Sequence, residues 1–318
     1  MRILMMGLIG SKTFLERLAE DLRSETLHVD LCFDHDRPSH FKDWAQTDIL
    51  VIYGLPCDAA DLNAAPGLRA IIVPSTGHEG IDIDAAAARG IAVANGKVPE
   101  NSESVAEAAF LLMLTALYDI DAARDRLRLN AQRSGAPTAR MLKGKTVGII
   151  GNGNIARALI DRLAGWNVEI LVHCRRPFPS RPGISHATLD KLLTESEIVL
   201  PLVSLTQDTH HLLSRSRLLS MKPGAILVNL SRGAIIEEAA LSERTVQHHL
   251  GTIALDVFET EPLPQDSPLR THEKAILTGH DIAHTRESVT ALFDMALSNI
   301  RAAIAGKEMP TVIRTASR

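Results

Sequence analysis

A glycine-rich turn between an apolar strand and a helix constrains the fold of this chain more than any other feature. The sequence from Gly144 to Ala156 is GKTVGIIGNGNIA. Its strand, Thr146–Ile150, is β-branched and apolar, as expected of a strand buried in a parallel sheet. The two glycines after the strand let backbone N–H groups approach a pyrophosphate, and the positive end of the following helix would face the same anion. The pattern predicts a dinucleotide site, with candidate contacts at Gly151, Gly153, Asn154 and Ile155.

Alternating strands and helices run through both halves of the chain and predict two α/β domains. The first alternation occupies about the first hundred residues, and a second begins at Lys145. A late helix after Thr285 indicates that the chain returns to the first domain. The predicted fold is two doubly wound parallel-sheet domains, with a Rossmann nucleotide-binding domain inserted in a flavodoxin-like substrate domain. The substrate-binding domain comprises residues 1–100 and 286–318, and the dinucleotide-binding domain comprises residues 101–285.

The bounds of the elements follow from apolar runs and capping signals. A long helix is expected over Ser104–Leu117, because Ser104 and Glu107 have the spacing of a capping box. The expected strands are Ile3–Leu8, Ile49–Tyr53, Ala70–Val73, Ile91–Ala94, Thr146–Ile150, Val168–His173, Ile198–Pro201, Ala225–Leu230 and Ile253–Val257. The other expected helices are Phe14–Leu22, Ile155–Leu163, Leu189–Thr194, Arg215–Ser220, Glu238–Gln247 and a closing helix through about Ile304.

The composition predicts a soluble, cytoplasmic, globular protein. The chain has 318 residues, 45% of them apolar, and a net charge of −4 with both signs dispersed. This balance favours neither a nucleic-acid nor a membrane partner, and no apolar run reaches the roughly 18 residues of a membrane span. Cys32, Cys57 and Cys174 are too far apart for a disulfide framework or a zinc spacing, so no metal is expected. The apolar stretch Met1–Gly10 is expected to form a buried strand rather than a signal peptide.

Three ordered motifs in the second half of the chain carry candidate catalytic residues. They are VNLSRGAIIEE from Val228, ALDVFETEPLP from Ala254 and TGH from Thr278. Together they resemble the catalytic signatures of the D-isomer-specific 2-hydroxyacid dehydrogenase family. The stretch STGHEGID from Ser75 resembles the substrate loop of that family, and the resemblance extends over nearly the whole chain.

The resemblance implies a role for each of several side chains. Arg232 would bind the substrate, Glu261 would hold the catalytic histidine, and His280 would be the general acid/base. Asp256 would meet the nicotinamide carboxamide. Backbone N–H groups for the substrate carboxylate would come from Thr76, Gly77 and His78.

These residue types also suit the chemistry independently of the resemblance. A planar guanidinium can engage the carboxylate and the adjacent carbonyl oxygen of a 2-oxo acid. Hydride arriving at the carbonyl carbon leaves an alkoxide to be protonated, and an imidazole with a pKa of about 6.5 suits that task. A carboxylate bonded to the imidazole favours its charged form. Gly279 stands before His280 where the family usually has proline, so His284 is the alternative acid/base.

The residues after the second strand of the nucleotide unit predict the cofactor. A site for NAD places an acidic residue there to hold the ribose hydroxyls. In this chain Cys174 stands at that position, and Arg175 and Arg176 follow it. Arginines attract a 2′-phosphate that an aspartate would repel. NADP is therefore the expected cofactor, and NAD is the less favoured one.

The sequence predicts an enzyme that uses NADPH to reduce a small 2-oxo acid, of glyoxylate or hydroxypyruvate type, to the D-2-hydroxy acid. One alternative is a non-catalytic, nucleotide-sensing interaction protein of the same fold, like the corepressors of this family. Another is a phosphoglycerate-type enzyme, although Gly54–Cys57 lacks the cation that such members typically carry after the preceding strand. Family members usually form homodimers through the nucleotide-binding domain, and Asp119–Met141 could reach a partner subunit.

Overall fold

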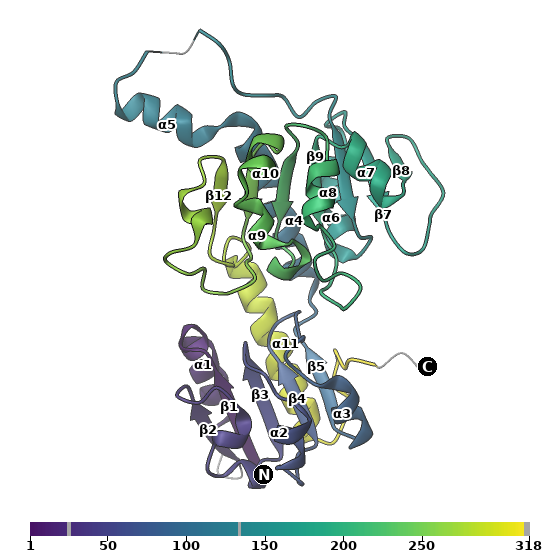
Figure 1. Cartoon of the computed structure of the whole chain (residues 1–318). Coiled ribbons are helices and arrows are strands. Elements are labelled where there is room, and N and C mark those ends of the chain that lie inside the picture. The colour runs from purple at the N-terminus through teal and green to yellow at the C-terminus, as the bar shows by residue number, and fades with distance from the viewer. Residues whose placement is uncertain (24–26, 133–134, 315–318) are drawn as a thin grey trace. The chain divides into compact units, whose positions relative to one another are not determined.

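The computed structural model describes residues 1–23, 27–132 and 135–314 (Figure 1). The chain forms two compact units: unit 1 contains Met1–Asn101 and Arg286–Arg318, and unit 2 contains Ser102–Thr285. Each unit is built on its own parallel sheet. The predicted fold class of two doubly wound α/β domains is therefore confirmed. The assignment of substrate binding to one domain and dinucleotide binding to the other stays a prediction.

The sheet of unit 1 has the strand order of a flavodoxin-like fold, β2-β1-β3-β4-β5, with all neighbours parallel. Its strands are β1 (Arg2–Gly7), β2 (His28–Cys32), β3 (Ile49–Tyr53), β4 (Ala70–Val73) and β5 (Ala92–Asn95). Its helices are α1 (Lys12–Leu22), α2 (Ala59–Asn63), α3 (Ile83–Ala88) and α11 (Arg286–Ile304).

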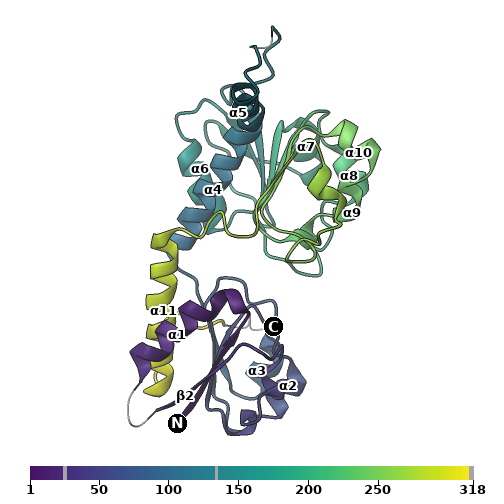
Figure 2. The ribbon, with the colours of Figure 1, turned by 90° about the vertical axis from the view of Figure 1, so that its left-hand side faces the viewer.

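Both faces of this sheet are covered, which explains why its central strands β1, β3 and β4 are largely apolar. Ile3 and Met5 of β1 belong to the core shared with α1 and α11, whereas Leu4 and Met6 belong to the core shared with α2 and α3. Figure 2 shows these two pairs of helices on opposite faces of the sheet. Because Phe293 of α11 lies in the first of these cores, the closing helix packs on unit 1.

The sheet of unit 2 has the order β12-β11-β10-β9-β6-β7-β8, again parallel. Counted from β6, this is the Rossmann order with one added strand, and the order reverses between β6 and β9. The strands are β6 (Thr146–Ile150), β7 (Glu169–His173), β8 (Ile184–His186), β9 (Ile198–Pro201), β10 (Ile226–Asn229), β11 (Ile253–Leu255) and β12 (Ala275–Leu277). The helices are α4 (Pro99–Tyr118), α5 (Ile120–Arg128), α6 (Asn154–Leu163), α7 (Leu189–Glu195), α8 (Arg215–Ser220), α9 (Glu238–Leu241) and α10 (Arg244–His249).

Two cores sandwich the sheet of unit 2. α4 and α6 pack on one face, and α7, α8, α9 and α10 pack on the other (Figure 2). The strand order reverses between β6 and β9, and both of these strands are buried on both faces. The glycine-rich turn directly follows β6. A helix-covered parallel sheet therefore presents that turn at its carboxyl edge.

Two of the expected helices differ in the structure. α4 begins at Pro99, five residues before the expected start, so Ser104 lies inside the helix and is not its N-cap. The hydroxyl of Ser104 instead donates to the carbonyl oxygen of Ala283 at 2.6 Å. The helix expected over Glu238–Gln247 is two short helices, α9 and α10, because Ser242 and Glu243 interrupt it.

α5 extends from the rest of unit 2, as Figure 1 shows, and none of its residues is buried. Leu127 on α5 is 83% exposed and Leu129 just after it is 77% exposed. Within the described ranges, no helix is both long and apolar enough to span a membrane.

Candidate active site

The glycine-rich turn lies where the strand order of unit 2 reverses. Gly151 has a φ of +117°, and a Cβ there would lie 2.3 Å from the carbonyl oxygen of Leu202, which follows β9. Only glycine fits this position. A Cβ at Gly153 would meet no described atom within 4 Å, so the space beside the first turn of α6 is open. The turn fits a pyrophosphate held by backbone N–H groups at the start of α6, where Asn154 and Ile155 stand.

Arg232 follows β10 in a turn that a buried asparagine holds in shape. Asn229, with no exposed surface, donates from Nδ2 to the carbonyl oxygen of Arg232 at 3.0 Å. Its Oδ1 accepts hydrogen bonds from the backbone N and the hydroxyl of Ser231, at 3.0 and 2.8 Å. A Cβ at Gly233 would lie 1.9 Å from the carbonyl carbon of Phe258, so glycine lets the turn pack on the neighbouring loop. Arg232 is thereby held at the carboxyl edge of the sheet.

The structure brings Glu261 and His280 together. Oε2 of Glu261 accepts a hydrogen bond from Nδ1 of His280 at 2.7 Å, and Oε1 accepts one from the backbone N of Phe258 at 3.0 Å. Because Nδ1 is engaged, Nε2 is the ring nitrogen that His280 can present to a small molecule. The two side chains are 46% (His280) and 36% (Glu261) exposed, so the pair is accessible from solvent. His284, the alternative acid/base, is exposed, and its backbone N donates to Asp281.

The charges around this pair shift both of its pKa values. The hydrogen bond donated to Glu261 raises the pKa of His280 above its ordinary value, although burial and the positive charge of Arg232 oppose the rise. Burial raises the pKa of Glu261, but the hydrogen bonds from His280 and Phe258 and the nearby positive charges outweigh it, so this pKa lies below its ordinary value. The pair is therefore stabilised as an imidazolium next to a carboxylate.

Asp256 organises the loop that carries His280. It is 3% exposed, and its Oδ1 accepts hydrogen bonds from the hydroxyl of Thr278 at 2.6 Å and from the backbone N of Asp281 at 3.3 Å. His280 lies between these two anchors with a φ of +61°, in the left-handed region that glycine adopts most easily. Asp256 thus helps to position the histidine, and its contact with a nicotinamide stays a prediction.

The predicted substrate loop belongs to unit 1 and follows β4. The carbonyl oxygen of Thr76 accepts a hydrogen bond from the side chain of Asn95 at 2.8 Å and lies 3.3 Å from Nδ1 of His78. The hydroxyl of Ser75 donates to the carbonyl oxygen of Gly77 at 2.8 Å. Side chains of unit 1 therefore fix the shape of this loop, and its role in binding substrate stays a prediction.

The loop after β7 carries the predicted determinants of the cofactor. Cys174 directly follows the strand, and its thiol donates to the carbonyl oxygen of Arg176 at 3.2 Å. Arg175 and Arg176 are both exposed. A neutral thiol and two exposed guanidinium groups thus stand where an NAD site has a carboxylate.

Two further arginines border a cavity beside this loop. The cavity has a volume of about 300 Å³ and is lined by Asn152, Arg157, Ile160, Phe178, Pro179 and Arg181. Arg162, on the same helix as Arg157, forms ion pairs with Glu103 and Glu107. By contrast, no carboxylate of the described residues forms an ion pair with Arg157 or Arg181, or with Arg175 and Arg176 in the loop after β7. The cavity therefore carries uncompensated positive charge.

Comparison with known proteins identifies the family. Residues 110–281 match the family described as D-isomer specific 2-hydroxyacid dehydrogenase, NAD binding domain, which is more than half of the chain. The chain belongs to this family. The resemblance inferred from the motifs is therefore confirmed, and the matched residues all lie within unit 2.

Several members of the dehydrogenase family are similar over most of the chain. The D-3-phosphoglycerate dehydrogenase of Mycobacterium bovis is 33% identical over 268 residues, which cover 83% of this chain but 50% of that protein. This chain thus spans about half the length of that relative. The glyoxylate/hydroxypyruvate reductase B of Pectobacterium carotovorum is 30% identical over 305 residues, 92% of this chain and 94% of that one. A solved NADPH-dependent glyoxylate/hydroxypyruvate reductase from Sinorhizobium meliloti, in complex with NADP and malonate, has a TM-score of 0.86 at 26% identity and covers 99% of both chains.

The sequence alone did not reveal the residues of this family member that shape the site without belonging to a recognised motif position. Asn229 stood within a quoted motif, but its hydrogen bonds to the turn depend on the backbone geometry after β10. Arg157 and Arg181 are far apart in sequence and meet only at the cavity beside the loop after β7. A signal existed only for Arg181, which lies in a stretch from Cys174 to Thr188 with three arginines and no acidic residue, whereas Arg157 stands four residues before Asp161.

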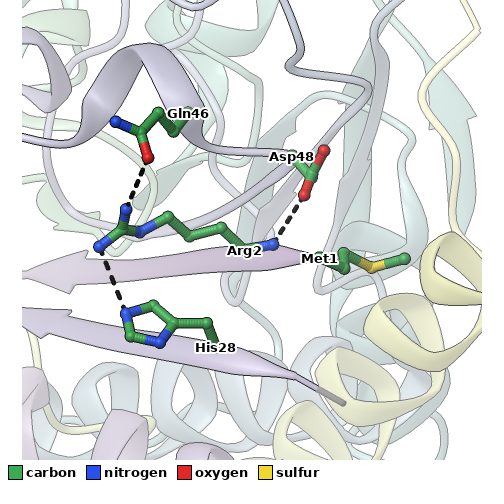
Figure 3. Close-up of a pocket in the computed structure, with 5 residues that line it drawn as sticks. All are labelled: Met1, Arg2, His28, Gln46 and Asp48. Carbon is green, nitrogen blue, oxygen red and sulfur yellow. Dashed lines mark hydrogen bonds between the residues drawn. The ribbon is translucent and has the colours of Figure 1, made fainter.

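A second hollow, in unit 1, does not belong to this site. It is lined by Met1, Arg2, His28, Gln46 and Asp48 and lies at the amino ends of β1 and β2 (Figure 3). The guanidinium of Arg2 is already committed to two aspartates in ion pairs of 2.7 Å. Ligands of such sheets bind at the carboxyl ends of strands, so this hollow is no candidate for the active site.

Proposed function

We propose that this chain catalyses the NADPH-dependent reduction of a small 2-oxo acid, of glyoxylate or hydroxypyruvate type, to the D-2-hydroxy acid. The observation that carries the proposal is the hydrogen bond between Nδ1 of His280 and Glu261 within the field of Arg232. It gives the site a charged proton donor with a fixed ring orientation. Family membership supports the same chemistry.

Residues of unit 2 would account for proton transfer and for one contact with the substrate carboxylate. The guanidinium of Arg232 would engage the substrate carboxylate and the adjacent carbonyl oxygen, which draws electron density from the carbonyl carbon. The bound dinucleotide supplies the hydride. Nε2 of His280 then gives its proton to the oxygen that becomes the hydroxyl, and Glu261 stabilises the imidazolium until that transfer. Backbone N–H groups of Thr76, Gly77 and His78 would hold the carboxylate.

The preference for NADPH rests on the charge around the loop after β7. Arg175 and Arg176 follow the strand, Arg157 and Arg181 line the adjacent cavity, and Cys174 replaces the acid that would hold ribose hydroxyls. None of these four arginines forms an ion pair with a carboxylate of the described residues. A 2′-phosphate of the cofactor would supply such an anionic partner. The solved relative bound to NADP supports the same preference.

A panel of 2-oxo acids, assayed with NADPH and with NADH, tests this proposal. We expect glyoxylate or hydroxypyruvate with NADPH to give the highest kcat/KM, and His280→Ala to lower the same turnover by about 10²–10⁴-fold. If a phosphorylated 2-oxo acid in the panel gave the highest kcat/KM, the result would instead favour a phosphoglycerate-type enzyme. The similarity to the mycobacterial D-3-phosphoglycerate dehydrogenase is the reason for including such an acid. Absence of turnover with every acid, at saturating NADPH that still binds, would favour the non-catalytic nucleotide sensor.

The same proposal includes a homodimer formed through unit 2. Apolar side chains on the outer surfaces of α4 and α5 are exposed to an extent unusual for a surface that faces only water. They are Leu111, Tyr118, Ile120, Leu127 and Leu129. Light scattering should give the mass of two chains, and Leu127→Asp should shift the mass toward one chain. A single-chain mass for the unsubstituted protein would remove the dimer from the proposal.

A further inference from the structure

A cluster of metal-ligand side chains lies at the carboxyl end of β2, the edge strand of unit 1. The ligand atoms of Cys32, Asp34 and His35 all lie within 4.8 Å of one another. The thiol of Cys32 donates to Oδ1 of Asp34 at 3.4 Å. Cys32 is buried, His35 is half-buried and Asp34 is exposed, so the cluster opens from the protein interior toward solvent. None of these residues takes part in the proposed reaction.

We propose that Cys32, Asp34 and His35 bind a zinc ion. Thiolate, imidazole and carboxylate are the three ligand types that Zn²⁺ takes in proteins, with bonds of about 2.0–2.3 Å. Tetrahedral bonds of that length separate neighbouring ligand atoms by roughly 3.5 Å, close to the 3.4 Å between Cys32 and Asp34. Three protein ligands leave the fourth position to a water molecule. The thiolate and the imidazole select zinc over Mg²⁺ or Ca²⁺, which prefer oxygen ligands.

The segment that follows the cluster is anchored independently of any metal. Arg37 forms ion pairs with Asp58 and with Asp61, the latter at 2.9 Å, and Ser39 also hydrogen-bonds to Asp61. Asp61 is 1% exposed, so this network ties the loop to the body of unit 1. Two carboxylates offset the guanidinium of Arg37, which lowers its repulsion of a cation nearby. The ligands therefore start from a preorganised loop, which reduces the entropic cost of binding.

The neighbouring His40 provides a matched control. It also follows β2 and its side chain is exposed, but its Nδ1 lies 2.9 Å from Oδ1 of Asp36. The geometry assigns it no metal bond. Cysteine spacing alone does not reveal this cluster, because it needs a single cysteine with an aspartate and a histidine close by.

Zinc binding to the full chain, freed of metal beforehand, tests the proposal. After incubation with Zn²⁺ and desalting in a weak chelator, elemental analysis should find a stoichiometric amount of zinc. We expect the affinity of Cys32→Ser and His35→Ala to fall by more than the roughly 10–100-fold that the loss of an outer-sphere partner costs. His40→Ala and Cys174→Ser should bind as the unsubstituted chain does. Co²⁺ should give a near-ultraviolet thiolate charge-transfer band that Cys32→Ser lacks.

The outcomes separate a built site from adventitious binding by surface histidines. Zinc lost in the desalting step, or affinities of Cys32→Ser and His35→Ala equal to that of the unsubstituted chain, would overturn the proposal. An equal loss in His40→Ala and His35→Ala would show that the three ligands are wrongly assigned. Because His35 is half-buried, His35→Ala tests the site even if Cys32→Ser fails to fold.

Discussion

Two charged regions of unit 2 differ in where their partners come from. Each oxygen of Glu261 and the Nδ1 of His280 has a partner within the chain. The arginines around the loop after β7 have no ion-pair partner among the described residues. The chain itself thus completes the geometry of the proposed proton donor, whereas the arginine cluster calls for an anion from a ligand. Substitutions should accordingly change rate in the first region and affinity in the second.

The largest effect is expected from the proton donor. His280→Ala should lower kcat by about 10²–10⁴-fold, because a general acid contributes that much to proton transfer. NADPH binding, measured by fluorescence titration, should stay unchanged. His284→Ala is the control and should keep most of its activity. A nearly inactive His284→Ala beside an active His280→Ala would reverse the assignment of the acid/base.

A smaller loss of rate is expected from Glu261→Gln. Losing a hydrogen bond between charged groups costs about 1.5–3 kcal/mol, or on the order of 10- to 100-fold. The same change should move the pH profile. Reduction needs protonated His280, so the rate falls as pH rises through the pKa of His280, which Glu261 holds above its ordinary value. Without the carboxylate this pKa falls, so the alkaline limb should shift to lower pH. An unshifted limb would mean that another group titrates there.

In the arginine region, Arg175→Ala should weaken NADPH binding by about tenfold or more, because one charge-assisted contact contributes about 1.5–3 kcal/mol. The Kd for NADH should hardly change, and kcat at saturating NADPH should stay close to that of the unsubstituted chain. Isothermal titration with both nucleotides measures the two constants. Equal affinities of the unsubstituted chain for NADPH and NADH would contradict the proposed preference.

The smallest effect is expected from an arginine whose partners are within the chain. Arg162→Ala breaks ion pairs with Glu103 and Glu107, which are mostly exposed, so unfolding should become easier by at most about 1 kcal/mol. The ratio of NADPH to NADH affinity should stay unchanged. If Arg162→Ala lowered that ratio as much as Arg175→Ala does, an ion pair within the chain would not separate structural arginines from cofactor-binding ones.

The interior strands of both sheets and the edge strand β5 could be predicted from sequence, whereas the other three edge strands could not. Strands such as Ile49–Tyr53 and Ile198–Pro201 are covered on both faces, so they stand out as apolar runs. The three edge strands that were missed are β2, which contains a histidine and an aspartate and is mostly half-buried, and β8 and β12, which have three residues each and are too short to stand out as an apolar run. The start of α4 was misplaced for another reason. Two local signals for the helix start compete: Pro99 suits the first turn of a helix, and Ser104 with Glu107 has the spacing of a capping box. The helix begins at the proline.

For the site, sequence motifs identified side chains but not what positions them. Glu261 and His280 were paired by resemblance to a family, and the structure has them in contact. The hydrogen bonds from Thr278 and Asp281 to Asp256 depend on the path of the backbone after β12, which no local sequence pattern predicts. The same applies to Arg157 and Arg181, which come together only because α6 and the loop after β7 border one cavity.

The left-handed backbone at His280 has a consequence for engineering. Replacing a residue in this region of backbone conformation with glycine relieves steric crowding, so the replacement is attractive when a protein is redesigned for heat resistance. In this chain that replacement would remove the proposed proton donor while the rest of the loop kept its anchors on Asp256. A variant library ranked by melting temperature alone would therefore reward loss of the reaction at this position. Position 280 has to be held constant whenever the chain is selected for stability.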